Sequence, residues 1–330
     1  MKKILIVTTK WYGGVHVGTP CHTKNLINSM ISVYKDTDVT HEVRYICEED
    51  IWSPEQLKKV LLETEFDIAL VSPFKNMVID METAEKLGKK LFVIVWDTHS
   101  ISTKIRYINM RIFLKAKADL GVVKYDPPLY DLSKFCNILV VDTGYGEMLP
   151  NIYCIFEPMD DSVLYPIPEE EKIYDISFIG STDIAERKWY ADQFKRHNLP
   201  VTFLGGRGDK DQKLTFEQWA ECHRKSKIEL NFNGNAFMGN RKSRVYEIAA
   251  CGNMMIATLP DVYKFHTGSW FDENVHFAAM TPDNYFDVIN YYLKNDDKRI
   301  AMAKAMHEHY KKNYSAKTWW ENLFKYSKDK

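Results

Sequence analysis

The sequence predicts an α/β protein made of two doubly wound halves, each with a parallel sheet between helices. Short apolar runs rich in Val, Ile and Leu alternate with helical patterns, which is typical of parallel strands covered on both faces. The alternation stops between residues 157 and 172 and then restarts. The length of 330 residues also favours two domains.

The first half begins with a strand and continues as a strand–helix series. Its strands are expected at 4–9, 43–47, 67–72, 91–96, 120–124 and 138–141. Its helices are expected at 21–34, 54–64, 80–88 and 103–117. Ser53 followed by Pro54 is typical of a helix start, since proline fits the first helical position. Lys10 and Trp11 follow the first strand too soon for a signal peptide, and no apolar run reaches the roughly 20 residues of a membrane span.

A proline-bearing acidic stretch, residues 157–172, separates the halves and is predicted to be a linker. The second half then has strands expected at 174–180, 201–204, 228–232, 254–258 and 275–278. Its helices are expected at 186–197, 215–226, 242–251, 282–294, 297–313 and 315–326. Thr215 and Gln218 form a predicted capping box. Gly252 follows a helix where a left-handed cap belongs.

These elements predict two Rossmann-like domains, residues 1–157 and 158–312, that face a cleft. A C-terminal helix within 313–330 is expected to dock back, because Trp319, Trp320 and Leu323 recur at helical spacing. Ligands of doubly wound sheets bind at the carboxyl ends of the strands. The cleft between the two domains is therefore the expected binding site.

The composition excludes several classes of protein. The chain has 44 Lys+Arg against 45 Asp+Glu, a net charge of -1, which excludes a strongly basic nucleic-acid coat protein. The six cysteines are scattered without a CxxC pair, which argues against structural zinc and favours a reduced, cytoplasmic compartment. The DxD patterns at 36–38 and 209–211 lie in predicted turns, so no metal site is predicted.

The densest group of polar residues follows the predicted strand 228–232. Arg241, Lys242 and Arg244 stand at the start of a helix, where cations are normally disfavoured unless an anion such as a diphosphate binds. Glu247 lies one turn after Arg244 and could accept hydrogen bonds from two ribose hydroxyls. The alternative is a solvated basic loop with one surface ion pair between Arg244 and Glu247.

A second loop follows the strand 174–180. Gly180 allows close approach of a ligand to the backbone, Ser181 offers a hydroxyl, and Arg187 and Lys188 supply two cations. We assign these four residues to the same donor-binding site. The alternative is an ordinary helix cap with exposed charges.

The first half offers a loop and an aspartate. Gly13, Gly14 and His16 follow the first strand without the order of a dinucleotide fingerprint or a P-loop, and are assigned to the acceptor side. Asp97 stands at the carboxyl end of the strand 91–96, where partial burial would raise its pKa toward that of a general base. Its alternative role is the N-cap of the helix 103–117. Two further acceptor-side residues complete the assignment, His22 and His99.

The residues resemble glycosyltransferases with two Rossmann-like domains, the GT-B class. The string at 174–181 looks like the strand and loop that open their nucleotide-binding domain. The string at 244–252 has the form R-x-x-E-x-x-A-x-G, typical of the CgeB-like branch of group-one transferases. This resemblance implies that Glu247 holds the donor ribose, that Arg187 and Arg244 hold the diphosphate, and that the donor is UDP-linked.

A narrower resemblance is to the T-even phage DNA beta-glucosyltransferases. It rests on the strand end and basic loop at 180–188, the string at 244–247, Asp97 as the proposed base, and the spacing of Trp320 and Phe324. This resemblance implies a DNA acceptor, which the neutral charge of the chain does not support.

Together these features predict a cytoplasmic glycosyltransferase that moves a hexosyl or pentosyl group from a nucleotide sugar to an acceptor hydroxyl. We expect inversion with Asp97 as base, no obligatory metal, and a glycan or other biomolecule as acceptor. Three alternatives remain: a DNA glycosyltransferase acting on 5-hydroxymethylpyrimidine, a nucleotide-sugar epimerase, and a non-catalytic sugar-nucleotide-binding protein.

Overall fold

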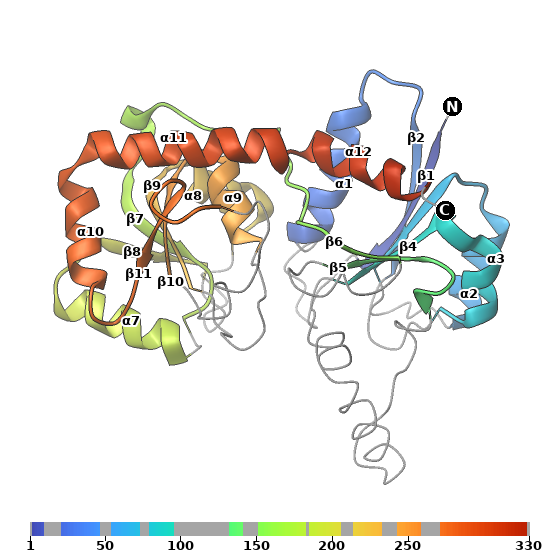
Figure 1. Cartoon of the computed structure of the whole chain (residues 1–330), viewed down its shortest axis with the longest axis horizontal. Coiled ribbons are helices and arrows are strands. Elements are labelled where there is room, and N and C mark those ends of the chain that lie inside the picture. The colour runs from blue at the N-terminus through green and yellow to red at the C-terminus, as the bar shows by residue number, and fades with distance from the viewer. Residues whose placement is uncertain are drawn as a thin grey trace, which may run out of the picture. The chain divides into compact units, whose positions relative to one another are not determined.

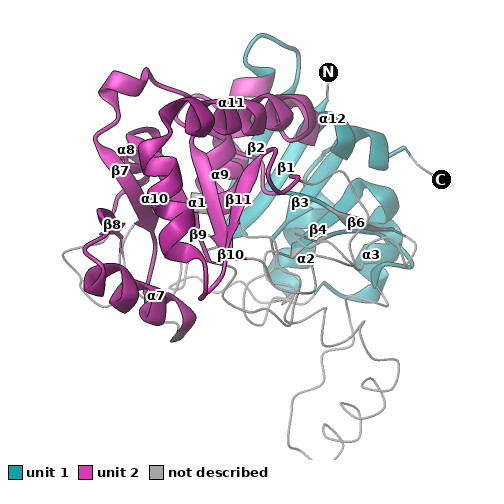
Figure 2. Cartoon of the chain, turned by 60° about the vertical axis from the view of Figure 1, so that its left-hand side comes forward, with its two compact units in different colours: residues 1–16, 34–156, 320–330 teal, residues 17–33, 157–319 magenta. Residues whose placement is uncertain are grey.

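The computed structural model describes residues 2–9, 21–46, 54–72, 79–95, 132–140, 151–182, 185–205, 214–232, 243–258 and 271–328 (Figure 1). The chain divides into two compact units (Figure 2). Unit 1 comprises residues 1–16, 34–156 and 320–330, and unit 2 comprises residues 17–33 and 157–319. Both units contain a parallel sheet, which confirms the predicted α/β class.

Unit 1 is built on a six-stranded sheet with the order β2-β1-β3-β4-β5-β6, and its strand pairs are all parallel. The strands are β1 (Lys3–Thr9), β2 (Thr40–Ile46), β3 (Ile68–Val71), β4 (Leu91–Val95), β5 (Asn137–Val140) and β6 (Ile152–Cys154). Helices α2 (Pro54–Glu63) and α3 (Met81–Leu87) and the 3-10 turn Gly88–Lys90 belong to this unit. Leu5, Val7, Leu61, Val93 and Ile138 form the centre of its apolar core, as the continuous apolar strands predict.

Two strands of unit 1 differ from the prediction. β2 begins at Thr40 rather than at residue 43, because it is an edge strand and its first residues, His41 and Glu42, are exposed polar side chains. β6, with three residues, was not predicted because it is too short to show a pattern. The helix predicted at 103–117 and the strand predicted at 120–124 lie outside the described residues.

Unit 2 is built on a five-stranded parallel sheet with the order β11-β10-β9-β7-β8. The strands are β7 (Tyr174–Ile179), β8 (Val201–Leu204), β9 (Ser226–Asn231), β10 (Met254–Thr258) and β11 (Phe277–Met280). The helices that follow these strands are α7 (Ala185–Arg196), α8 (Phe216–Arg224), α9 (Arg244–Ala250), α10 (Tyr285–Lys294) and α11 (Asp296–Asn313). β8 and β9 lie on opposite sides of β7, so the strand order reverses between β7 and β9.

Three predicted helix ends are found among the described residues of the two units. α2 begins at Pro54. Thr215 accepts a hydrogen bond from the Gln218 amide while the Gln218 side chain accepts from the Thr215 amide, which confirms the capping box. Gly252, after α9, has φ +63°, the left-handed conformation that glycine adopts without strain.

The segment 157–172 is not the loose linker that its composition suggested. Met159 and Leu164 are buried, and Glu169 of the acidic run pairs with Lys172 at 2.8 Å and with Arg299 of α11 at 2.7 Å. The acidic run packs because basic side chains meet it, a tertiary pairing that composition does not reveal.

Helix α1 (Cys21–Tyr34) follows β1 in the sequence, but residues up to 33 belong to unit 2 (Figure 2). The Asn28 side chain donates to Asp160 Oδ2 at 2.9 Å, and Lys24 pairs with Glu217 of α8 at 3.1 Å. These polar contacts join α1 to the rest of unit 2.

The last helix, α12 (Ala316–Tyr326), joins unit 1 from Trp320 onward. Trp320 is fully buried and its ring lies 6.1 Å from that of Tyr34. Tyr326 stacks on Tyr153 with 4.0 Å between the ring centroids. Among the described helices of the chain, none has the length and apolar character needed to cross a membrane.

Candidate functional site

The reversal of strand order in unit 2 marks the place where a doubly wound sheet binds its ligand. Gly180 follows β7 at this point and has φ +141°. Its amide donates to the Leu204 carbonyl of β8 at 2.7 Å. Arg244, the first residue of α9, reaches the same strand end, and its Nη2 atom donates to the Ile179 carbonyl at 2.7 Å.

The Arg244 guanidinium group is only partly satisfied by the protein. Its Cζ atom lies 4.6 Å from the centre of the Phe178 ring. Its Nε and Nη1 atoms are buried and have no hydrogen-bond partner in the part of the chain that the structure describes. Burial lowers the pKa of Arg244 below its usual value, while Glu247 and Glu229 oppose this shift. An arginine nevertheless keeps its charge at neutral pH, so two N–H donors remain for an anion.

A second arginine approaches the same aromatic ring. Arg187, in the first turn of α7, is buried, and its Cζ atom lies 5.4 Å from the centre of the Phe178 ring. Its Nη1 atom donates to the Ser181 carbonyl at 2.9 Å. The ring attracts each cation, but two cations on one ring repel each other, and an anion between them would relieve that repulsion.

Lys188, although adjacent to Arg187, lies on the exposed side of α7 and pairs with Asp192 at 3.2 Å. The structure thus brings Gly180, Ser181, Arg187 and Arg244 together around the end of β7 and Phe178. It does not bring Lys188 into this group.

Glu247 is buried one turn after Arg244, and its carboxylate is bound by a histidine. Glu247 Oε2 lies 3.1 Å from Nε2 of His223 in α8. The surface ion pair between Arg244 and Glu247 considered above is therefore not the arrangement found. Burial alone would raise the pKa of Glu247, but His223, Arg244 and Ser243 together hold that pKa below its usual value. Glu247 is thus an ionised acceptor at neutral pH.

His223 has a second carboxylate on its other nitrogen. Its Nδ1 atom lies 2.7 Å from Oε2 of Glu229 in β9, and both side chains are fully buried. Burial by itself would lower the pKa of His223, but the two glutamates raise it to about 9. Neither His223 nor Glu229 was predicted as a site residue from the sequence. The available signal was Glu229, a charged residue between Ile228 and Leu230 in a predicted buried strand, because a buried charge needs a partner.

Glu157 is a further buried carboxyl group beside these residues. Burial and the nearby charge of Glu247 raise the pKa of Glu157 to about 8, while hydrogen bonds from Asn25 of α1 and Ser243 act in the opposite direction. Glu157 is therefore protonated at neutral pH, which limits its repulsion of Glu247.

Several predicted site residues cannot be placed by this geometry. The following lie outside the described residues: Gly13, Gly14, His16, Asp97, His99, Arg241 and Lys242. Asp97 comes two residues after the end of β4 in the sequence, and His22 lies in the first turn of α1.

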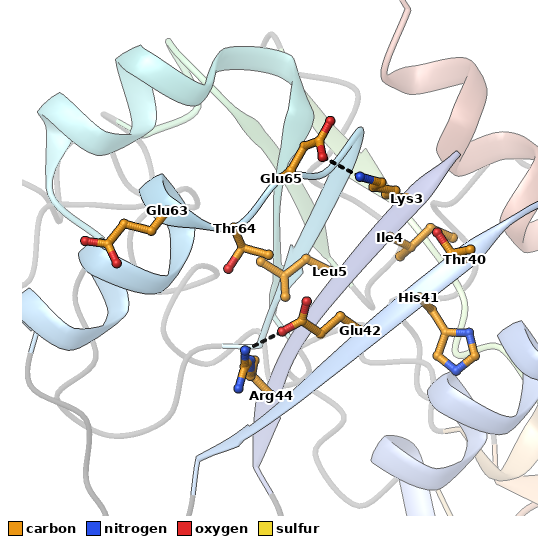
Figure 3. A pocket seen from close by; sticks show the side chains of 10 residues that line it. All are labelled: Lys3, Ile4, Leu5, Thr40, His41, Glu42, Arg44, Glu63, Thr64 and Glu65. Carbon is orange, nitrogen blue, oxygen red and sulfur yellow. Dashed lines mark hydrogen bonds and ion pairs between the residues drawn. The ribbon is translucent and has the colours of Figure 1, made fainter. Parts of the chain in front are cut away.

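A surface hollow of about 480 Å³ in unit 1 is unrelated to these groups (Figure 3). It lies beside Lys3, His41 and Arg44, near the amino ends of β1 and β2, which is the end opposite to ligand sites in parallel sheets. Its charges are already matched, since Arg44 pairs with Glu42 and Lys3 pairs with Glu65. Across the described ranges, no group of three or more His, Cys, Asp or Glu residues could hold a metal ion.

Comparison with known proteins assigns this fold and site to a class. The model of a family described as glycosyl transferase-like matches residues 164–325, which include the Gly180–Arg244 group and Glu247. No curated protein matches the chain. The fold is that of the GT-B class of glycosyltransferases, and the match to the glycosyl transferase-like family model agrees with it.

Solved structures extend the likeness to the whole chain. Anabaena Alr3699/HepE in complex with UDP-glucose has a TM-score of 0.58 and 12% identity over 98% of this chain and 99% of that chain. An alpha-glucosyltransferase in complex with UDP and a 13-mer DNA containing a HMU base has a TM-score of 0.57 and 11% identity over 99% of this chain and 100% of that chain. A glycosyltransferase from Rickettsia africae ESF-5 has a TM-score of 0.50 and 12% identity over 98% of this chain and 97% of that chain. Residues 164–325 of the chain are therefore similar to the glycosyl transferase-like family.

Proposed function

We propose that this glycosyltransferase uses a UDP-linked sugar, whose diphosphate binds Arg244 and Arg187 and whose ribose binds Glu247. The observation that carries the proposal is the convergence of two buried arginines on Phe178 at the reversal of strand order. The complexes of HepE with UDP-glucose and of the alpha-glucosyltransferase with UDP support the choice of nucleotide.

The arginines would also stabilise the departing UDP. Negative charge grows on the diphosphate as the bond to the sugar breaks, and donors already held in a buried site stabilise that charge without reorganising. Arg244 offers Nε and Nη1, which have no partner among the described residues. For this reason we propose transfer without an obligatory metal ion.

The acceptor half of the proposal concerns five residues of unit 1 and His22 of α1, which belongs to unit 2. Asp97, after β4, would remove the proton from the acceptor hydroxyl, with Gly13, Gly14, His16, His22 and His99 on the acceptor side. The acceptor we favour is a saccharide, because the chain carries no excess of positive charge. In the part of the chain that the structure describes, Cys136, Cys222 and Cys251 are free, which supports a reduced cytoplasmic setting.

DNA is the second candidate acceptor. It is favoured by the alpha-glucosyltransferase bound to a 13-mer DNA, which matches 99% of the chain with a TM-score of 0.57, against 98% and 0.58 for HepE. A DNA acceptor predicts binding that weakens steeply with salt.

The test is an assay with five donors, UDP-glucose, UDP-galactose, UDP-N-acetylglucosamine, UDP-xylose and GDP-mannose. Acceptors are oligosaccharides and duplex DNA containing hydroxymethylpyrimidines, with and without EDTA, and products are detected by mass spectrometry. Transfer from a UDP-sugar to a saccharide, undiminished by EDTA, is expected. Transfer to DNA would select the second acceptor, and transfer only from GDP-mannose would contradict the choice of UDP. Donor conversion without acceptor would indicate an epimerase, and binding without any product would indicate a binding protein.

A further inference from the structure

Three buried ionisable side chains from three different elements form a continuous line in unit 2. Glu229 of β9, His223 of α8 and Glu247 of α9 are joined by contacts of 2.7 Å at Nδ1 and 3.1 Å at Nε2 of the histidine. The side chains of His223 and Glu229 are fully inaccessible, whereas 8% of the Glu247 side chain is exposed. Glu247 is therefore the member of the line that a ligand can reach.

Glu229, at the end of this line away from Glu247, is held in place by other protein groups. Glu229 Oε1 accepts a hydrogen bond from the Asn253 side chain at 2.6 Å, so both oxygens of Glu229 are engaged. The Asn253 side chain also donates to the His223 carbonyl. The Trp219 ring packs edge-on against the imidazole with 4.9 Å between centroids. His223 is thus held on several sides before any ligand binds.

The histidine is charged in this arrangement. A neutral imidazole has one N–H donor and one acceptor, so one of its nitrogens would face a carboxylate without a proton. A protonated imidazole carries a proton on both nitrogens and a positive charge, so it can form an ion pair with each of the two carboxylates. The raised pKa of His223, about 9, agrees with this reasoning. Among the described residues, the other charged or titratable groups near the line are Arg244 and Glu157, which lie near Glu247, and the thiols of Cys222 and Cys251, which lie near Glu229. Glu157 is protonated at neutral pH, and burial raises the pKa of both thiols, so Arg244 is the charged member of this group.

We propose that His223 is a positioning residue for the nucleotide donor: clamped by Glu229, it binds Oε2 of Glu247 and orients that carboxylate toward the ribose diol. This inference rests on the proposed function, which assigns the ribose to Glu247. His223 itself touches no ligand in this arrangement. Its effect on the donor is transmitted through the carboxylate alone.

The test compares the binding of nucleotides that have the ribose 2′,3′-diol with the binding of nucleotides that lack it. Dissociation constants are measured by calorimetry for UDP and for 2′,3′-dideoxy-UDP, and in parallel for GDP and 2′,3′-dideoxy-GDP. The wild-type protein should bind the diol form more tightly. His223→Gln should lower the affinity for the diol form about tenfold and leave the dideoxy form unchanged. The selectivity of the wild type should also decline above pH 9, where His223 loses its proton, and that decline should be absent from the variant.

Two further variants distinguish a positioning effect of His223 from a general loss of structure. His223→Gln with Glu229→Gln removes a positive and a negative charge together, so no charge is added to the buried line, and it should show the same loss of selectivity. His307→Gln is the matched control, because His307 contacts the Ala249 carbonyl of α9 through Nδ1 at 2.8 Å without touching Glu247. That control should keep the selectivity of the wild type.

The outcomes distinguish this inference from the proposed function. If the wild type binds diol and dideoxy forms equally, or if Glu247→Ala keeps the selectivity, the ribose role of Glu247 is wrong and the role of His223 falls with it. If Glu247→Ala abolishes the selectivity but His223→Gln retains it, only the positioning role is wrong. Parallel weakening of both ligands in His223→Gln, or diol-specific loss in His307→Gln, would also overturn the positioning role.

Discussion

Gly180 and Arg244 share one small volume at the carboxyl end of β7. A Cβ atom on residue 180 would lie 2.7 Å from Nη2 of Arg244, closer than real Cβ contacts. The same Nη2 atom donates to the Ile179 carbonyl at 2.7 Å. The guanidinium group of Arg244 can reach the backbone of β7 only because residue 180 has no side chain.

Replacing Gly180 tests this relationship directly. In Gly180→Ala the guanidinium must leave the Ile179 carbonyl, so we expect the affinity for UDP, measured by calorimetry, to fall about tenfold or more. Some loss of stability is also expected, because φ +141° is strained for alanine. The matched control is Gly88→Ala, a glycine of unit 1 with φ +56° and no atom within 4 Å of the added Cβ. Equal loss of UDP affinity in both variants would contradict the prediction.

Arg224, elsewhere in unit 2, has surroundings similar to those of Arg244 and provides a matched control for it. Arg224 also donates to a backbone carbonyl, that of Val163 at 2.7 Å, and also lies over an aromatic ring, that of Tyr165 at 4.8 Å. Arg244→Ala should weaken UDP binding by about 10- to 100-fold, because charge-assisted contacts to the diphosphate are lost. The affinity of the Arg244→Ala variant for uridine, which has no phosphate, should equal that of the wild type. Arg224→Ala should affect thermal stability alone, and an equal loss of UDP affinity in that control would refute the assignment.

The fold and half of this site could be predicted from the sequence because their signals are local. Continuous apolar runs such as those of β7 and β10 show strands buried on both faces. A glycine at a strand end and an arginine one turn before a glutamate are likewise visible within a few residues. These patterns led to Gly180, Arg244 and Glu247.

The other half of the site depends on contacts between distant parts of the chain. His223 lies in the last turn of α8 and Glu229 lies in the next strand, and no spacing rule shows that His223 contacts both Glu229 and Glu247. The packing of α1 into unit 2 and the burial of Glu157 are equally tertiary, since neither leaves a periodic pattern. A charged residue in a buried strand, as at Glu229 in β9, indicates that a partner exists but does not identify it.

Glu157 should make the stability of the protein depend on pH. Its pKa is raised from 4.5 to about 8 in the folded state, mainly by burial and then by Glu247. The folded state therefore binds this proton more tightly than the unfolded state. The stabilisation is complete below about pH 4.5 and is lost as the pH rises through about 8.

Glu157→Gln removes this titration while keeping a neutral side chain of similar shape. Relative to the wild type, the free energy of unfolding of the variant should rise between pH 5 and pH 8, on the order of 1 to 3 kcal/mol. Denaturant unfolding at each pH measures this difference. Glu170→Gln, at an exposed position of the same segment, is the control and should show no such trend. A constant difference between Glu157→Gln and the wild type at all pH values would show that Glu157 is ionised in the folded protein.

The proposed role of Asp97 as general base leads to a prediction about turnover and about the stereochemistry of the product. If it is the general base, Asp97→Asn should bind UDP as the wild type does but lose turnover by about 100-fold or more. Asp67→Asn is the matched control, because Asp67 precedes the neighbouring strand β3 and accepts a hydrogen bond from the Lys3 amide at 2.8 Å. That control should keep full turnover. The product decides the steric course, since direct displacement on an α-linked UDP-sugar gives a β-glycoside, which nuclear magnetic resonance distinguishes from the α form. An α-glycoside as the product, or near-normal turnover of Asp97→Asn, would rule out inversion with Asp97 as base.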